Sequence, residues 1–594
     1  MKIKKELLYF LPILLLIIGG YLFYQNRYRK ENTNREEHIS EMDTDMTLDN
    51  SDTEIDWTTY TAKELELTES ITITEEGIYT LSGTLENGSV TVNTKGNVKL
   101  ILNNVHIKNE NGPAIYIENA KTTVIWLEEG TENSVEDGST YSTYEEAVNG
   151  TIYSKDDLVF DGLGKLYVTA NYEDGIVGKD DVKIINGTYN VASKDDGIRG
   201  KDSIYILNGD FQITAGGDAI KTTNDTDTKK GFIYIENGNF TIEATCDGMD
   251  AENKIFIQDG KFTIKTGGGS ENASHTSSDW GNWGKKEVQT TDTASAKGIK
   301  AKTNLVIQGG IFILDTSDDS IHSNNSIGIG GGEFTISSGD DGIHADTEII
   351  IEAGNISIEK SYEGIEVAKI TIQGGTISVV SSDDGINVAG GKDASSIGRP
   401  GENQYTENTD NVLKIYGGTI YVNANGDGID VNGSGYVYGG DITVDGPSDS
   451  GNGALDYDRE FVVDGGTISL VGSSGMLQGI SSSSKQYNVI INFGQNYSEN
   501  SQIEVFDDKG EVLLSKTPSK SFSSFVFSLS KLKKDGSYII KVNGEVIEQF
   551  TISEITTTIG TIGGIGPGGK GGRGEKNPEG ERPMGPSGKP EGRR

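Results

Sequence analysis

A repeat of about 22 residues constrains this chain of 594 residues more than any other feature. The repeated signature is Asp-Asp-Gly-Ile or a near variant, and longer gaps between copies mark insertions. Self-similarity of this kind predicts a stack of equivalent units rather than a compact globule. The last residue of the signature falls at Ile176, Ile198, Ile220, Met249, Ile299, Ile321, Ile343, Ile365, Ile386 and Ile429.

A second pattern lies between the signatures and predicts the fold. A Gly-Gly pair precedes residues that alternate in polarity, as in 309–314 and 374–379. Alternation is typical of a strand with one buried face, and each unit has room for about three short strands. We therefore predict an all-β protein, a right-handed parallel β-helix with about 22 residues per coil. Propeller blades need roughly 40–50 residues, and the leucine-rich repeat frame is absent.

The composition agrees with a long, thin core. The chain has 80 Gly, only 10 Pro and 34% apolar residues, so tight turns are frequent and the interior is small. A single cysteine, Cys246, excludes a disulfide framework and a thiolate zinc cluster. The net charge of −39 would repel a polyanion, so we expect no nucleic acid partner. We expect a monomer.

The two ends of the chain differ from the repeats. Leu7 to Tyr24 is uncharged, has basic flanks and is not followed by a small-x-small cleavage site. We predict an uncleaved membrane anchor over residues 1–30, with cleaved export as the alternative. The acidic bulk favours a single-pass cell-membrane protein whose ectodomain is extracellular. The further segments that we predict are an acidic stalk (31–60), the β-helix (61–484), a small β-rich domain (485–555) and a disordered Gly-, Pro- and Arg-rich tail (556–594).

A column of carboxylates lies two residues before each signature apolar residue, and we call it the acid column. Stacked coils would place these charges about 5 Å apart, where they repel unless cations bind. Paired hard oxygen ligands suit Ca²⁺. The alternatives are turn chemistry, with Asp bonding to nearby backbone N–H groups, and a catalytic role. The predicted calcium ligands, with the acids that precede them, are Asp174, Asp195, Asp196, Asp218, Asp247, Asp318, Asp319, Asp340, Asp341, Glu363, Asp383, Asp384 and Asp427, while Lys297 takes one slot of the column.

A mixed column lies directly after the signature apolar residue. It runs Val177, Arg199, Lys221, Asp250, Lys300, His322, His344, Glu366, Asn387 and Asp430. Its cations could balance the acid column, bind the carboxylate of a uronate sugar, or act as the base of a lyase beside calcium. The predicted ligand-binding residues of this column are Arg199, Lys221, Lys300, His322 and His344. We predict no catalytic residue.

Two tryptophans form the other ligand candidate. Trp280 and Trp283 lie in a polar, Gly-rich insertion with the pattern Asp-Trp-Gly-Asn-Trp. Aromatic faces stack on the apolar face of a sugar ring, and the alternative is that one ring packs the loop onto a coil.

Three stretches of the chain resemble a bacterial family of carbohydrate-binding domain-containing proteins. These are residues 70–138, the GGGSENAS sequence at 267–274 and the TPSKSFSSFVFS sequence at 517–528. With the repeats, the resemblance extends over roughly 60–553. It implies a polysaccharide-lyase-like β-helix with bound calcium that binds cellulose or acid-sugar polymers such as pectate, and it does not by itself imply lyase activity.

Taken together, these features predict a cell-surface, calcium-loaded protein that binds polysaccharide and is attached to the membrane by its N-terminal helix. A calcium-dependent pectate-type lyase is the alternative, and a structural surface protein or adhesin is the third hypothesis. Asp250 breaks the run of cations in the mixed column, which favours binding over catalysis.

Overall fold

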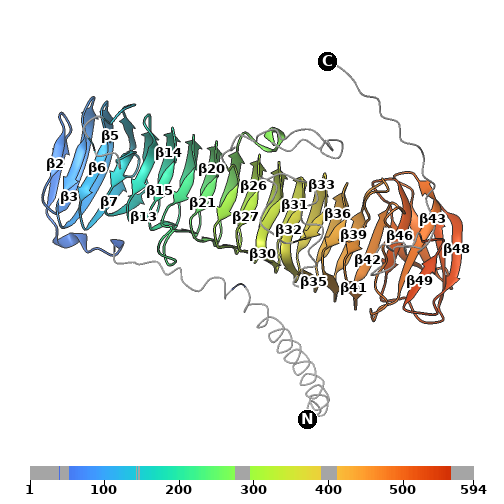
Figure 1. The fold of residues 1–594 in the computed structure, drawn as a ribbon. Coiled ribbons are helices and arrows are strands. Elements are labelled where there is room, and N and C mark those ends of the chain that lie inside the picture. The colour runs from blue at the N-terminus through green and yellow to red at the C-terminus, as the bar shows by residue number, and fades with distance from the viewer. Residues whose placement is uncertain are drawn as a thin grey trace, which may run out of the picture.

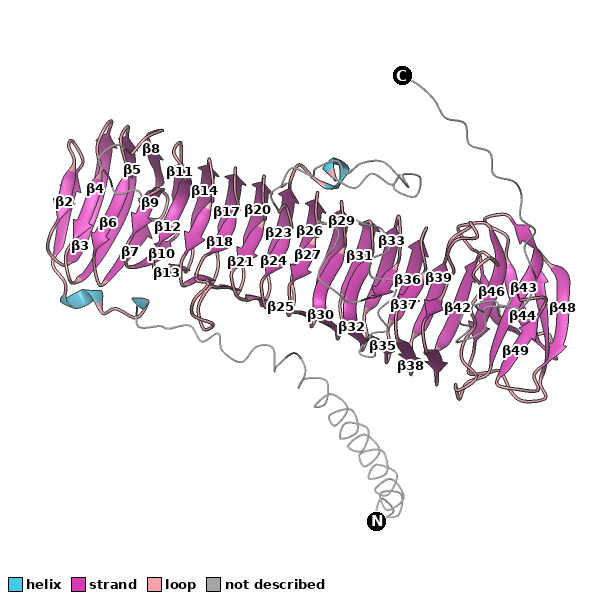
Figure 2. Ribbon diagram, in the orientation of Figure 1, coloured by secondary structure: helices cyan, strands magenta, loops and turns pink. Residues whose placement is uncertain are grey.

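The computed structural model describes Ile39 and residues 52–141, 144, 148–273, 295–389 and 411–562. These residues form an elongated stack of short strands, from the blue N-terminal coils to the red C-terminal end (Figure 1). Strands and the turns between them make up nearly the whole stack (Figure 2), apart from the short 3-10 helices η2 (Trp57–Thr59) and η3 (Ser270–Asn272).

Most strands of the stack pair in parallel with the third strand after them in the chain. This is the pairing order of a parallel β-helix, in which three strands make one coil. The predicted all-β class with a long parallel sheet is thus confirmed, while the handedness of the coil stays a prediction.

Three faces run along the stack, and we number them in chain order within a coil. Face 1 carries the signature apolar residues. It consists of β2 (Ile71–Ile73), β4 (Val90–Asn93), β6 (Ile115–Asn119), β9 (Gly150–Ser154), β12 (Asp174–Gly178), β15 (Ile198–Gly200), β18 (Ile220–Thr222), β21 (Met249–Ala251), β24 (Ile299–Ala301), β27 (Ile321–Ser323), the first parts of β30 (Ile343–Ile351) and β32 (Ile365–Ile372), β34 (Ile386–Val388), β37 (Ile429–Val431) and β40 (Asp456–Tyr457).

Face 2 follows face 1 in each coil. It consists of β1 (Ala62–Glu66), the first parts of β3 (Gly77–Leu85) and β5 (Asn97–Asn109), β7 (Thr122–Leu127), β10 (Asp157–Gly162), β13 (Asp181–Ile184), β16 (Ser203–Ile206), β19 (Phe232–Ile235), β22 (Ile255–Ile257), β25 (Asn304–Ile307), β28 (Ser326–Ile329), the second parts of β30 and β32, β35 (Val412–Ile415), β38 (Ser434–Val437) and β41 (Glu460–Val463).

Face 3 completes the coil. It consists of the second parts of β3 and β5, then β8 (Glu132–Asp137), β11 (Lys165–Thr169), β14 (Thr188–Ser193), β17 (Asp210–Ala215), β20 (Asn239–Ala244), β23 (Lys261–Thr266), β26 (Ile311–Thr316), β29 (Glu333–Ser338), β31 (Asn355–Lys360), β33 (Thr376–Ser381), β36 (Thr419–Ala424), β39 (Asp441–Asp445) and β42 (Thr467–Gly472).

The repeat fixes the register, so that like residues stack inside the coils. On face 1, Ile198 pairs with Ile176 and with Ile220, and all three are fully buried. On face 3, aromatic rings form a second internal stack, with Phe262 lying 4.8 Å from Phe240 and 4.6 Å from Phe312 between ring centroids. These separations match the spacing of paired strands, so each coil continues the core of the last.

The Gly-Gly turn before face 3 has a steric cause. Gly332 has a φ of +108°, and a Cβ there would lie 3.0 Å from the carbonyl oxygen of Gly310 in the preceding coil. Glycine accepts this conformation and this close approach of stacked backbones, whereas a larger residue would strain both.

Antiparallel strands close the C-terminal end of the stack. β46 (Phe522–Ser528) pairs antiparallel with β42 and with β43 (Asn488–Tyr497), and so covers the last parallel edge. A separate four-stranded sheet consists of β45 (Val512–Lys516), β44 (Ile503–Asp507), β47 (Ser537–Val542) and β48 (Glu545–Thr551).

Both predicted flanking segments contain ordered residues. β49 (Thr556–Ile559) pairs with β43 inside the predicted disordered tail, because this short Thr- and Ile-rich run suits a strand. Asp52, in the predicted stalk, is buried, and its carboxylate lies 2.6 Å from Lys183 Nζ on face 2. The predicted anchor Leu7–Tyr24 lies outside the described residues, among which no helix is long and apolar enough to cross a membrane.

Candidate functional site: the acid column and its cations

The turn between face 3 and face 1 holds the acid column. One oxygen of most of these carboxylates accepts a hydrogen bond from the backbone N–H of the equivalent residue in the next coil. Asp196 N–H donates to Asp174 Oδ1 at 3.0 Å, and Asp218 N–H donates to Asp196 Oδ1 at 3.0 Å. The same bond recurs from Asp247 to Asp218, Lys297 to Asp247, Asp341 to Asp319, Glu363 to Asp341 and Asp427 to Asp384. Turn chemistry therefore accounts for one oxygen at these positions.

The second oxygen faces the mixed column, and in the first coils it meets a cation there. Asp174 Oδ2 lies 2.8 Å from Arg199, and Asp218 Oδ2 lies 2.6 Å from Lys221 Nζ. Asp247 Oδ2 lies 3.0 Å from Lys300 Nζ.

The two histidines of the mixed column also contact carboxylates of the acid column. His322 Nδ1 lies 2.8 Å from Asp319, and His344 Nδ1 lies 3.1 Å from Asp341. The acid-column carboxylates from Asp174 to Asp341 thus have basic partners within the protein, and we call this stretch the neutralised half. Burial still raises the pKa of Asp174 to about 7, although Arg199 opposes this shift.

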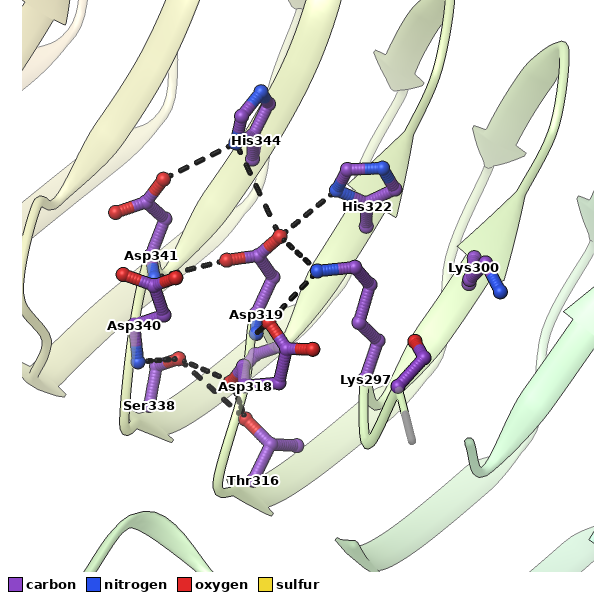
Figure 3. A network of polar contacts seen from close by, with 12 residues as sticks. Lys297, Lys300, Thr316, Asp318, Asp319, His322, Ser338, Asp340, Asp341 and His344 are labelled. Atoms are coloured by element: carbon purple, nitrogen blue, oxygen red, sulfur yellow. Dashed lines mark hydrogen bonds and ion pairs between the residues drawn. The ribbon is translucent and has the colours of Figure 1, made fainter. Parts of the chain in front are cut away.

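Lys297 supplies a cation from within the acid column itself (Figure 3). Its Nζ lies 2.7 Å from Asp318 and 2.7 Å from Asp319, and its side chain is buried. Burial alone would raise the pKa of Asp319, but Lys297, His322 and His344 outweigh burial and hold that pKa well below its usual value. The single basic residue in the predicted column is therefore a countercharge for two carboxylates.

Further along the stack the cations stop. The mixed column continues with Glu366, Asn387 and Asp430. Of the described basic residues, none forms an ion pair with the four carboxylates of this half, which we call the acid cluster. Its members are Glu363, Asp384, Asp427 and Asp430.

The acid cluster is an unfavourable place for charge. Burial raises the pKa of Asp384 well above its usual value, and Asp383, Asp430 and Asp427 raise it further. Burial, Asp427 and Asp456 likewise raise the pKa of Asp430 well above the usual range. Burial raises the pKa of Asp427 to about 7. Ionised carboxylates in this setting need a counterion.

Asn387 adds an oxygen without a donor to this cluster. Its residue pairs with Glu366 in one neighbouring coil and with Asp430 in the other. Its Nδ2 donates to Glu363 Oε2 at 2.7 Å, whereas its buried Oδ1 accepts no hydrogen bond from the described residues. A buried amide oxygen among carboxylates is costly without a cation, and these hard oxygen donors are the kind that Ca²⁺ prefers. The donor set of the acid cluster therefore fits calcium.

Other predicted calcium ligands lie in closely spaced groups as well. Ligand atoms of Asp174, Asp195 and Asp196 lie within 4.8 Å of one another, as do those of Asp318, Asp319 and Asp340. Each group has a basic partner, Arg199 in the first and Lys297 in the second. Asp383 stands beside the acid cluster, where it raises the pKa of Asp384.

The predicted ligand-binding cations are occupied by these ion pairs. Arg199, Lys221 and Lys300 contact acid-column carboxylates, and His322 and His344 are buried against them. A uronate would compete with these contacts, and a role in ligand binding stays a prediction for all five residues. Trp280 and Trp283 lie outside the described residues. Sequence reasoning did not single out Asn387 or Asp430 as functional, although both continue the mixed column.

Comparison with known proteins agrees with the predicted resemblance. A family model described as carbohydrate-binding domain-containing protein matches residues 68–342. A carbohydrate-binding domain-containing protein of Acetivibrio thermocellus is 35% identical over 126 residues, which are 20% of this chain and 44% of the relative. The chain thus matches less than half the length of that relative.

One solved structure is similar to part of the chain. It is described as the polysaccharide lyase-like protein from C. thermocellum, in a gadolinium derivative. The identity is 30%, the match covers 35% of this chain and 91% of the other, and the TM-score is 0.34.

The family match ends part-way along the acid column. The carbohydrate-binding domain match ends at residue 342, directly after Asp341, so it contains the acid-column carboxylates of the neutralised half. The acid cluster, from Glu363 to Asp430, lies beyond the match.

Proposed function

We propose that this protein binds polysaccharide and that its acid cluster holds Ca²⁺, which recruits acid-sugar polymers such as pectate. One observation carries the calcium part: among the described residues, the buried carboxylates of the acid cluster have no basic partner, and Asn387 Oδ1 in the same coils has no donor. The match of residues 68–342 to the carbohydrate-binding domain family model supports the carbohydrate part. A cell-surface location belongs to the same proposal and rests on the apolar segment Leu7–Tyr24 and the acidic composition.

The residues that would hold calcium are Glu363, Asp384, Asp427, Asp430 and the amide oxygen of Asn387. Two carboxylates about 5 Å apart repel by about 3 kcal/mol at an effective dielectric constant of about 20, so a divalent ion here removes a large penalty. Bound calcium supplies a positive centre that a uronate carboxylate can contact. Backbone hydrogen bonds to Asp384 and Asp427 hold these ligands in place before the ion binds.

The alternative of a pectate-type lyase lacks a base beside the acid cluster. A lyase of this kind needs a basic group next to calcium to remove a proton from the sugar. The mixed column offers Glu366, Asn387 and Asp430 at this end. The nearest basic residue of the mixed column is His344, which lies two coils from Asn387, or about 10 Å at the spacing of paired strands, and contacts Asp341 and Glu366. Lys300 lies four coils away and is bound to Asp247. This arrangement favours binding over cleavage.

The test is a native affinity gel of the full chain cast with polygalacturonate, with calcium or with a chelator. We expect retardation only with calcium, and intact polymer afterwards. A cleared zone around the band would identify a lyase instead. Equal migration in both gels and in a polymer-free gel would reject pectate as the ligand.

A matched pair of variants ties the result to the acid cluster. Asp430→Asn removes a charge from the cluster, whereas Asp195→Asn removes an exposed charge from the neutralised half. We expect only the first to weaken calcium-dependent retardation. Equal behaviour of the two variants would mean that the cluster is not the site.

A further inference from the structure

Two exposed tyrosines stack on each other at a different edge of the stack. Tyr416 follows β35 and Tyr438 follows β38, in neighbouring coils whose strands pair from Val412–Ser434 to Ile415–Val437. The ring centroids are 4.9 Å apart with an interplanar angle of 21°. The residues are 46% and 45% exposed, although such rings usually bury much of their surface.

The coil does not require tyrosine at this position. The equivalent residue is polar in several coils, as at Gln308, Glu352, Gln373 and Asp464, and is Ile185, Leu207 or Gly330 in others. In the coils directly before and after them, the two tyrosines are flanked by the polar residues Gln373 and Asp464, so the ring pair is a local aromatic surface at the protein exterior. A paired exposed aromatic surface that contributes nothing to the core is a feature of binding sites.

The side chains next to the ring pair are smaller than the rings. Each tyrosine is followed by a Gly-Gly pair, and a Cβ on Gly439 would lie 2.6 Å from the carbonyl oxygen of Tyr416. The stacked backbones therefore exclude a side chain at that point. The equivalent residue is Gln373 in the coil before Tyr416 and Asp464 in the coil after Tyr438. Neither side chain is as large as a tyrosine ring, and both tyrosines remain nearly half exposed.

Polar groups suited to hydroxyl groups lie beside the rings. Asp464 takes the equivalent position in the coil after Tyr438 and forms an ion pair with the exposed Lys485. The acid and the base next to the rings therefore offset each other. Such a pair offers an acceptor and a donor to the hydroxyls of a neutral sugar and does not require a charged one.

We propose that Tyr416 and Tyr438 form a stacking platform for neutral hexopyranose units of a polysaccharide, with Asp464 accepting hydrogen bonds from sugar hydroxyls. The apolar C–H face of a pyranose packs on an aromatic ring. This platform lies on the turn between faces 2 and 3, apart from the acid cluster on the turn between faces 3 and 1, and beyond the family match at 68–342. The inference rests on the proposed carbohydrate-binding function.

The experiment uses the full chain with the double substitution Tyr416→Ala and Tyr438→Ala. The probes are hydroxyethylcellulose as a soluble neutral glucan and polygalacturonate, each cast in an affinity gel with calcium. We expect the double variant to bind the neutral glucan about tenfold more weakly, because two ring contacts are lost, while its retardation by polygalacturonate is unchanged. Both rings are exposed, so the melting temperature should stay close to that of the wild type.

Two control variants define the cause. Tyr416→Phe with Tyr438→Phe keeps the ring faces and should retain binding. Tyr167→Ala removes an exposed tyrosine from another face and should have no effect. Unchanged binding of the neutral glucan by the double alanine variant would overturn the platform while the carbohydrate function stands. If the wild type binds neither polymer, the proposed function fails and the platform fails with it.

Discussion

The two halves of the acid column use the same backbone and differ in how they treat charge. In both, a carboxylate oxygen accepts a backbone N–H from the next coil, as at Asp174 and at Asp384. In the neutralised half the other oxygen meets a cation three residues further along its own coil or in the next coil, such as Lys221 or Arg199. In the acid cluster, the corresponding residues are Glu366, Asn387 and Asp430.

The difference separates structure from binding. A carboxylate that is bonded to both a backbone amide and a lysine has little left to offer a ligand. A carboxylate that is bonded to the backbone alone keeps one oxygen for an external cation. The column therefore stabilises turns along its whole length, and calcium is expected only where the internal cations stop.

Removing an internal cation should have the largest effect. Lys297→Met leaves Asp318 and Asp319 without their shared ammonium group, and loss of one partner of a buried pair costs about 3–5 kcal/mol. We expect this loss in the free energy of unfolding, measured by denaturant titration. Calcium should restore part of it, since the variant turns the neutralised half into an acid cluster.

Lys302→Met is the matched control, because Lys302 pairs with Glu252 at the exposed surface. Such pairs contribute about 0–1 kcal/mol. A Lys297→Met variant as stable as this control would contradict the assigned role of the buried pair.

Chelation should have the next largest effect. At a calcium concentration about a hundred times the dissociation constant, bound calcium stabilises a protein by about 2.7 kcal/mol. Thermal melts of the wild type with calcium and with a chelator should differ accordingly. An Asp384→Asn and Asp427→Asn double variant should lose most of this difference. Coincident wild-type curves after thorough chelation would remove calcium from the acid cluster.

A cation placed in the acid cluster should imitate the neutralised half. Asp430→Lys puts an ammonium group three residues after Asp427, which is the relation of Lys221 to Asp218. A hydrogen bond between charged groups contributes about 1.5–3 kcal/mol, so we expect a more stable calcium-free protein. The response to calcium should shrink at the same time, as measured by calorimetry. A gain in stability with an unchanged calcium response would show that the ion binds elsewhere.

The fold could be predicted because its signal repeats. The spacing between Ile176 and Ile198 is the pairing register itself, and Lys297 was correctly assigned to a slot of the acid column from its place before Gly298-Ile299. The flanking segments lack a repeat, and there the prediction was weaker. β49 and the buried Asp52 depend on contacts with distant strands that no local pattern encodes.

The positions of the acid column could be predicted from the repeat, but its division into the neutralised half and the acid cluster was not predicted. The sequence places Asp218 and Asp427 in the same slot, and both accept a backbone hydrogen bond. What separates them is the partner of the second oxygen: Lys221 lies three residues after Asp218, whereas Asp430 lies three residues after Asp427. The sequence contains this difference, but it shows neither that Lys221 contacts Asp218 nor that Asp427 is buried.

The histidines should give the neutralised half a pH dependence of its own, with the smallest expected effect. Burial alone would lower the pKa of His344, but Asp341, Asp346, Asp319 and Glu366 outweigh it and raise that pKa well above its usual value. The stabilisation is thus fully present below about pH 6.5, the usual pKa, and is lost as the pH rises through the folded value. The His322 ring lies 5.0 Å from this ring between centroids, and Lys297 Nζ contacts the Asp319 carboxylate that both histidines face. We expect wild-type stability to fall by at most about 1.4 kcal/mol per pH unit above neutrality from this one proton, and the His344→Gln variant to lack that slope. Denaturant titrations from pH 6 to 9 in the presence of calcium measure the difference, and parallel curves for the two proteins would mean that His344 is uncharged in the fold.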